Sequence, residues 1–107
     1  MRAPAQFVAG DKDTIAPIAE HQRPIFAAKP PSNQLRTITG GSHCGFMDSS
    51  GLFCDTGSIT RAAQLTAAKR VTTSWFRHYL AGDTAARDLV WGQAARTDPA
   101  VVFEGTE

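Results

Sequence analysis

Two residues that could act together in acid–base chemistry each follow a short apolar stretch of this sequence. Asp13 lies four residues beyond a stretch that ends at Ala9, and His43 lies four residues beyond one that ends at Thr39. A carboxylate that accepts a hydrogen bond from Nδ1 of a histidine fixes the tautomer of the ring and supports the imidazolium that forms when the ring acts as a base. Either residue alone is common in loops, but the matched spacing predicts the acid and the base of a nucleophilic triad.

The two apolar stretches must be neighbouring strands if they are to position this pair. Residues 5–9 form a short, mainly apolar run between a proline and a glycine, which is typical of a buried strand. Residues 35–39 alternate apolar with polar or β-branched side chains before two glycines, which predicts a second strand. About 25 residues separate the two runs, and a short helix is expected there at residues 25–28, between Pro24 and Pro30. This order predicts a βαβ unit, whose strands run parallel.

Parallel strands joined by one crossover end at the same edge of the sheet, where open α/β sheets place their sites. The loops that carry Asp13 and His43 are therefore expected to be neighbours. Asp11 lies nearer to the end of the first strand and competes with Asp13 for the role of the acid. The other interpretation of Asp11 is a residue that caps the turn.

The longest periodic stretch predicts a helix over residues 59–81 that stops at Gly82. The tail that follows offers a helical turn at 89–91 and an edge strand at 101–103. We therefore predict an α/β fold in which a βαβ unit is closed by a long amphipathic helix, as one unit over residues 1–107 with its core at about 4–83 and a tail over 84–107. The helix face expected to cover the sheet comprises Leu65, Ala68, Thr72, Trp75, Phe76 and Tyr79.

The composition narrows the class of protein. The chain has 107 residues, 42% of them hydrophobic and 20% charged, which suits one folded domain or a piece of one. The formal net charge is +1 with neither sign clustered, which argues against a nucleic-acid partner. No stretch approaches the roughly 18 consecutive apolar residues of a membrane span, and the first residues lack the apolar run of a signal peptide. We expect neither a nucleic-acid nor a membrane partner, and the compartment stays open.

An ordered succession of motifs resembles the C-terminal part of α/β-hydrolase-fold esterases, among them the cutinase-like polyester hydrolases and the dienelactone-hydrolase-like and chlorophyllase-like groups. The motifs are residues 10–17 (Gly-Asp-Lys-Asp-Thr-Ile-Ala-Pro), 21–26 (His-Gln-Arg-Pro-Ile-Phe), 40–43 (Gly-Gly-Ser-His), 75–76 (Trp-Phe) and 80–83 (Leu-Ala-Gly-Asp). The resemblance implies that Asp13 is the triad acid and His43 the triad base of a carboxylic ester hydrolase. It also implies a partial α/β-hydrolase fold, and full-length members of these groups are often secreted.

The nucleophile of such an enzyme is missing from this chain. It stands on a Gly-x-Ser-x-Gly elbow, and no such pentapeptide is present. Ser42 and Cys44 adjoin the histidine and are poor substitutes, because nucleophile and base must approach each other with a space for substrate between them. The oxyanion hole would also come from segments before Met1. Whether Met1 is the true start stays open.

Two function hypotheses follow. The chain is the acid–base module of an ester hydrolase, inactive alone and completed by a serine from elsewhere, or it is a non-catalytic remnant or interaction domain that keeps the fold. A small parallel sheet leaves unpaired strand edges. We therefore expect self-association, or pairing with an N-terminal hydrolase segment, through these edges.

The loop after His43 contains the two cysteines, Cys44 and Cys54, ten residues apart. The sequence is compatible with a disulfide between them and with two free thiols. Together with His43 and Asp55 they offer zinc-type ligands, but their spacing matches no structural zinc site, so we expect no metal and no cofactor. Phe46 has two interpretations, a wall of a substrate pocket and a side chain that packs beneath the loop.

Overall fold

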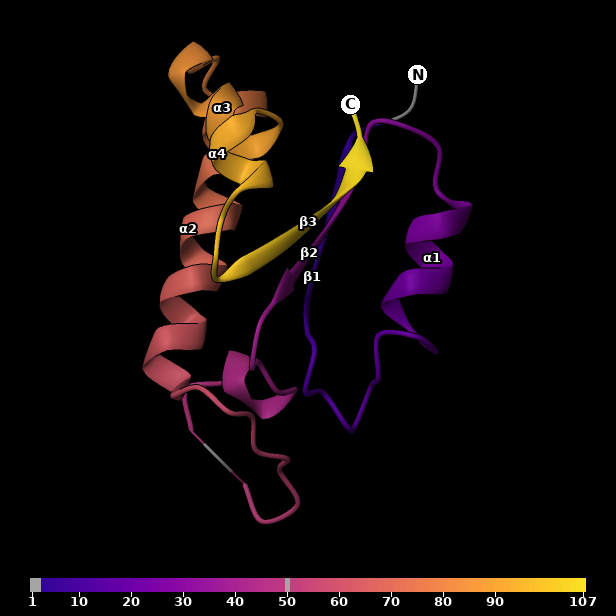
Figure 1. Cartoon of the computed structure of the whole chain (residues 1–107), viewed down its shortest axis with the longest axis vertical. Coiled ribbons are helices and arrows are strands. Elements are labelled where there is room, and N and C mark those ends of the chain that lie inside the picture. The colour runs from indigo at the N-terminus through magenta and orange to yellow at the C-terminus, as the bar shows by residue number, and fades with distance from the viewer. Residues whose placement is uncertain (1–2, 50) are drawn as a thin grey trace.

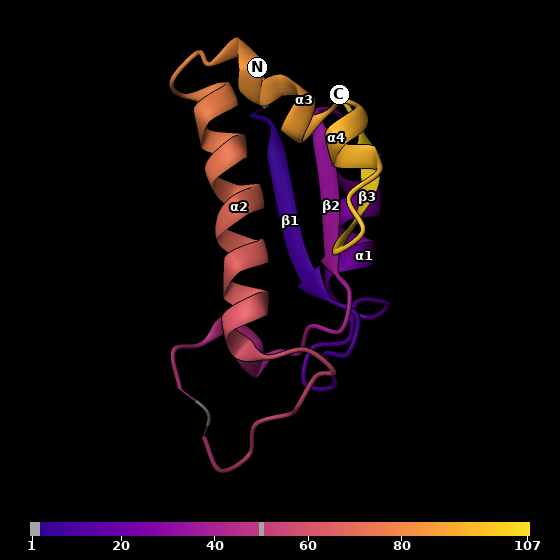
Figure 2. The same cartoon turned by 60° about the vertical axis from the view of Figure 1, so that its left-hand side comes forward.

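A mixed sheet lies between two helices (Figures 1 and 2). The computed structural model describes residues 3–49 and 51–107. The sheet consists of strands β1 (Ala5–Gly10), β2 (Asn33–Ile38) and β3 (Val101–Thr106). Helix α1 (Gln22–Ala28) packs on one face of the sheet and the long helix α2 (Arg61–Tyr79) on the other. The α/β class predicted from the sequence is confirmed.

The remaining elements are short. A 3-10 turn, Cys44–Phe46, follows β2, and a second one, Thr84–Ala86, follows α2. Two single-turn helices, α3 (Arg87–Val90) and α4 (Gln93–Arg96), then lead to β3. Figure 1 shows α3 and α4 beside the C-terminal end of α2, at the end of the molecule away from the loops that follow β1 and β2.

The sheet contains one parallel and one antiparallel pair. Strands β1 and β2 pair in parallel from Ala5 opposite Asn33 to Gly10 opposite Ile38. Strand β3 pairs antiparallel with β2, so the sheet has three strands where the βαβ prediction counted two, and the edge strand expected at residues 101–103 extends to Thr106. Within the described residues, β1 and β3 each pair with β2 alone, and each keeps one unpaired edge.

The core between the sheet and α2 is built from two apolar clusters. One joins Ile38 and Val101 of the sheet to Ala67 and Val71 of α2. The other joins Trp75 of α2 to Val90 and Trp91 in the segment after that helix. The indole of Trp91 donates a hydrogen bond of 2.9 Å to the hydroxyl of Tyr79. The second cluster consists of Trp75, Val90 and Trp91, with Tyr79 and Phe103 packed against it.

The buried face of α2 differs from the predicted one. Trp75 is buried as expected, but Phe76 is 56% exposed. Two polar side chains occupy the buried face because each finds a hydrogen-bond partner: Gln64 bonds to the backbone of Ser42, and the hydroxyl of Ser74 donates to a carbonyl oxygen of its own helix. The buried residues of α2 are Gln64, Ala67, Val71, Ser74 and Trp75.

The ends of α2 follow the capping rules. The side chain of Thr60 accepts a hydrogen bond of 3.1 Å from the amide of Ala63, so the helix begins at Arg61, after the predicted start at residue 59. Beyond its other end, Gly82 has a φ of +65°, a conformation that glycine adopts without strain. None of the helices in the described ranges is both long enough and apolar enough to span a membrane.

A buried arginine lies at the centre of the sheet. The side chain of Arg36 is 1% exposed and its guanidinium lies 3.7 Å from the carboxylate of Asp98. Burial lowers the pKa of Arg36, and the charge of Asp98 counteracts this. Asp98 also forms an ion pair with Arg70 on α2, which ties the segment before β3 to the long helix.

We predict that Asp98→Asn lowers the free energy of unfolding by about 3 kcal/mol, because it leaves the charge of Arg36 buried without its carboxylate. Arg36→Met should cost much less, since no unpaired charge stays buried and Asp98 keeps its partner Arg70. Urea unfolding of both variants measures the difference, with the exposed Asp48→Asn as the control. Equal losses in Asp98→Asn and Arg36→Met would contradict this account.

Candidate active site

The candidate site lies at the carboxyl edge of the parallel pair, where the loops after β1 and β2 meet. These loops contact each other through their backbones. The amide of Lys12 donates to the carbonyl oxygen of Gly41 over 2.8 Å, and a Cβ atom at Gly10 would lie 2.5 Å from the carbonyl carbon of Gly41. The close approach requires glycine at position 10, because any larger residue would separate the loops.

Asp11 does not contact His43 in this structure. Its carboxylate accepts a hydrogen bond of 2.7 Å from the amide of Gly40, at the start of the loop after β2. The carboxylate of Asp11 therefore satisfies one backbone amide of the turn, which is the second of its two interpretations. This leaves Asp13 as the carboxylate that faces the histidine.

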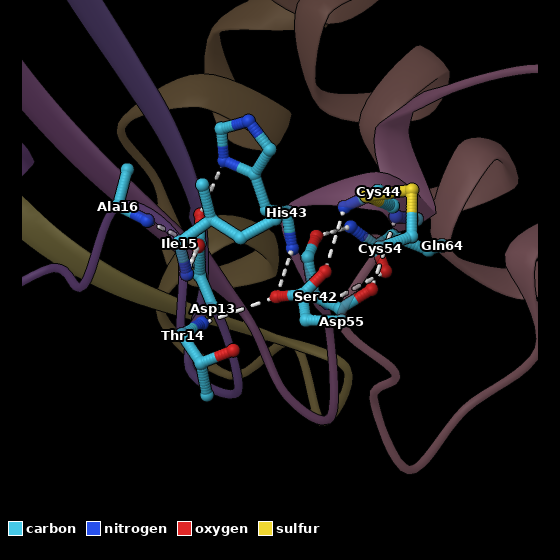
Figure 3. A network of polar contacts seen from close by, with 11 residues as sticks. Asp13, Thr14, Ile15, Ala16, Ser42, His43, Cys44, Cys54, Asp55 and Gln64 are labelled. Carbon is cyan, nitrogen blue, oxygen red and sulfur yellow. Dashed lines mark hydrogen bonds and ion pairs between the residues drawn. A yellow bond between two sulfur atoms is a disulfide. The ribbon is translucent and has the colours of Figure 1, made fainter. Parts of the chain in front are cut away.

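The carboxylate of Asp13 is held from both of its oxygens (Figure 3). Oδ1 accepts hydrogen bonds from the amides of Ile15, over 3.0 Å, and Ala16, over 2.7 Å. Oδ2 lies 3.1 Å from Nδ1 of His43. The side chain of Asp13 is 2% exposed. The short Asx-type turn therefore orients the buried carboxylate toward the ring.

The imidazole of His43 is partly exposed and is oriented by this contact. Its side chain is 43% exposed. Because an ionised carboxylate only accepts hydrogen bonds, Nδ1 carries the hydrogen in the neutral ring and Nε2 keeps the lone pair. Figure 3 shows Nδ1 turned toward Asp13 and the rest of the ring pointing away from it. Nε2 is thus the atom that can take a proton from an approaching group.

A further carboxylate, that of Asp55, holds the backbone of both loops, although its sequence position indicated only a possible zinc-type ligand. One oxygen of Asp55 accepts from the amides of Thr14, over 3.1 Å, and His43, over 3.0 Å. Its other oxygen accepts from the amide of Cys44 over 3.0 Å. Burial raises the pKa of Asp55, but these three amide donors, together with the charge of His43, lower it below its usual value of 3.8 overall.

Gln64 of α2 supports the same loop from the core side. Its Oε1 accepts from the amide of Ser42 over 2.9 Å, and its Nε2 donates to the carbonyl oxygen of Ser42 over 2.7 Å. The hydroxyl of Ser42 accepts from the amide of Gly45 over 3.0 Å, and Ser42 is 4% exposed. The backbone and the hydroxyl of Ser42 are therefore engaged in the turn after β2.

The two cysteines are joined. Cys44 and Cys54 form a disulfide with a Cα–Cα distance of 5.6 Å. This settles the choice between a disulfide and free thiols, and it removes Cys44 as a substitute nucleophile. Among residues 3–49 and 51–107, no group of three or more His, Cys, Asp or Glu side chains is placed to hold a metal ion.

Of the two interpretations of Phe46, the structure shows the one in which the side chain packs beneath the loop. It is partly buried and packs against the core cluster that contains Ile38 and Val71. Its role as a wall of a substrate pocket stays a prediction. The described residues form a hollow of about 270 Å³ on this side of α2, and neither Asp13 nor His43 lines it. Its lining consists of Ser42, Cys44, Gly45, Asp55, Thr56, Gly57, Ile59 and Arg61.

Neither a protein-family model nor a curated protein matches this sequence. A buried carboxylate, an imidazole that it orients and a partly exposed Nε2 make an acid–base pair that can accept a proton from a nucleophile and return it to a leaving group.

We predict that loss of the disulfide lowers the free energy of unfolding by about 2 to 3 kcal/mol, because the unfolded chain then regains the entropy of the loop that the bond closes. The double variant Cys44→Ser/Cys54→Ser, compared with the oxidised parent in urea, gives the value. Reduction of the parent with dithiothreitol should reproduce it. A double variant as stable as the oxidised parent would disprove this prediction.

We also predict a pH-dependent contribution of Asp55. Its folded-state pKa lies below the unfolded value of 3.8, so its stabilisation is fully present above pH 3.8 and is lost as the pH falls through the lower folded-state pKa. Asp55→Asn should therefore cost about 1 to 2 kcal/mol at neutral pH and progressively less in acid. Unfolding measured over a pH series tests this, and a cost that stays constant into strong acid would show that ionisation of Asp55 is irrelevant.

Proposed function

We propose that this chain is the C-terminal module of a carboxylic ester hydrolase, in which Asp13 is the acid and His43 the base of a serine-type triad. The observation that supports the proposal is the contact of 3.1 Å between Asp13 Oδ2 and His43 Nδ1, formed by a carboxylate that is 2% exposed and a ring that is 43% exposed. The ordered motifs that resemble the α/β-hydrolase esterases add to it.

The proposed reaction uses Nε2 of His43 twice. In the first half, Nε2 takes the proton of a serine hydroxyl, the serine oxygen attacks the ester carbonyl, and the imidazolium returns the proton to the alcohol as the ester bond breaks. In the second half, Nε2 takes a proton from water, the resulting hydroxide attacks the acyl-serine, and the imidazolium reprotonates the serine as the acid leaves. Asp13 holds the ring and stabilises the imidazolium in both halves.

The serine and the oxyanion hole come from another polypeptide segment in this proposal. The chain contains no Gly-x-Ser-x-Gly elbow, and the hydroxyl of Ser42 is taken by the turn. The free edge of β1 offers a place for that segment, because a strand added in parallel there would end at the same sheet edge as Asp13 and His43. The partner that supplies the serine is therefore an N-terminal hydrolase segment. A second copy of this chain could pair at the same edge but would bring no elbow.

The alternative function is a non-catalytic remnant or interaction domain. The missing elbow favours it for the chain alone. The two proposals differ in what they require of His43: a remnant needs the histidine for nothing beyond local structure, whereas the hydrolase module needs its Nε2 for turnover.

We predict that the isolated chain hydrolyses a short-chain p-nitrophenyl ester no faster than background, and that activity appears when it is joined to an N-terminal segment bearing the elbow. In that assembled protein, His43→Ala should abolish turnover, and Asp13→Asn should lower kcat by about 10⁴-fold, since the ring would be held in the wrong tautomer. His21→Ala, at an exposed histidine before α1, is the matched control.

Absence of activity in the assembled protein would favour the remnant. Activity that survives His43→Ala would overturn the assignment of the base. Activity of the isolated chain that depends on His43 would contradict the need for a second segment.

A further inference from the structure

Asp55 lies 12 residues after the base, in the connection from β2 to α2, and its carboxylate binds the backbone beside both the acid and the base. The disulfide between Cys44 and Cys54 holds the residue before Asp55 next to the residue after His43. Figure 3 shows the carboxylate between the two loops, below the ring of His43.

The three amides that donate hydrogen bonds to Asp55 belong to residues in or beside the Asp13–His43 pair. Thr14 follows the acid directly, His43 is the base itself, and Cys44 follows the base. One oxygen, Oδ2, accepts from Thr14 and from His43 at once. This single atom therefore joins the backbone beside the acid to the backbone of the base.

The other ties between the two loops lie closer to the strands. Asp11 binds the amide of Gly40, and the amide of Lys12 binds the carbonyl oxygen of Gly41. These contacts align the loops where they leave the sheet. The distance between residues 13 and 43 is therefore controlled by the Asp55 bridge and by the contact between His43 Nδ1 and Asp13 Oδ2.

We propose that Asp55 is a positioning residue of the acid–base pair: by accepting from Thr14 and His43 through one oxygen, it sets the distance between the Asp13 carboxylate and the His43 ring. The consequence for catalysis depends on the proposed function, but the geometric role does not. The lowered pKa of Asp55 agrees with a carboxylate that stays ionised while it performs this role.

Asparagine at position 55 separates this role from simple loop folding. Its side chain has nearly the size of aspartate but one acceptor oxygen and an N–H₂ group, so it can accept from the bridging amides or from Cys44 but not from both sets. The matched control is Asp48→Asn, which removes an exposed carboxylate from the same loop. A positive control is Asp13→Asn, which removes the acceptor of the Nδ1 hydrogen.

The test is NMR spectroscopy of the whole chain, with two readouts. The first is the downfield resonance of the His43 Nδ1 hydrogen, which is slow to exchange only while the contact with Asp13 holds. The second is the exchange rate of the Thr14 and His43 amides relative to the amides of Leu35 and Ile38 in β2.

In Asp55→Asn we expect the Nδ1 resonance to broaden or disappear, as in Asp13→Asn, and the relative exchange of the Thr14 and His43 amides to rise about tenfold. Asp48→Asn should match the parent in both readouts. An Nδ1 resonance that persists unchanged in Asp55→Asn would overturn the proposal. So would an equal acceleration of all these amides, because that pattern means that Asp55 only stabilises the fold.

These readouts need no turnover, so they separate the positioning role from the proposed function. If the assembled protein is active, Asp55→Asn should lower its kcat by about tenfold with little change in KM, since a misplaced base affects the reaction more than substrate binding. If the assembled protein is inactive while the NMR result holds, the hydrolase proposal fails and the positioning role remains. A kcat unchanged in an active Asp55→Asn protein would count against the positioning role.

Discussion

The parallel pairing of β1 and β2 is the constraint on which the rest of this structure depends. The register places Gly10 opposite Ile38, so the two strands end at the same level and their following loops begin side by side. The backbone contact between Lys12 and Gly41 then continues the alignment past the end of the sheet. Two residues that are 30 positions apart in the chain thereby meet at hydrogen-bond distance. The helices on either face stabilise the sheet, but this register is what allows an acid and a base to share one edge.

Backbone amides stabilise the carboxylates that gather at this edge of the sheet. Three aspartates, Asp11, Asp13 and Asp55, lie in or beside the two loops, and each of them accepts hydrogen bonds from main-chain N–H groups. Such bonds stabilise the ionised form of a carboxyl group and offset the cost of its burial. The same bonds satisfy amide groups that irregular loops leave unpaired. The negative charges and the ordered loops thus stabilise each other, and the imidazole of His43 lies where they converge.

How far the sequence predicts the structure differs from one element to the next. The ends of β1 and β2 were predictable to within two residues, because apolar runs bounded by glycine and proline have few other conformations. The strand predicted at residues 101–103 stopped three residues before the end of β3 at Thr106. The buried face of α2 was predicted wrongly at Phe76, which is exposed, and at Gln64, which is buried. Periodicity weighs apolar residues alone, whereas Gln64 is buried through two hydrogen bonds to Ser42, a residue 22 positions earlier. A polar residue in line with Ala67 and Val71 was the signal that could have indicated it.

The sequence by itself determined the α/β class, the sheet edge at which Asp13 and His43 lie, and the absence of a nucleophile elbow from this chain. These depend on residue types, on local periodicity and on the handedness of crossovers. The matched spacing and the resemblance also favoured Asp13 over Asp11 as the partner of His43. The tertiary structure alone decided that Cys44 and Cys54 are bonded and that Asp55 bridges the two loops. Asp11, Asp13 and Asp55 are chemically identical, so residue type could not show which backbone amides each carboxylate accepts from. The difference between them is the set of amide groups that the folded chain brings to each carboxylate.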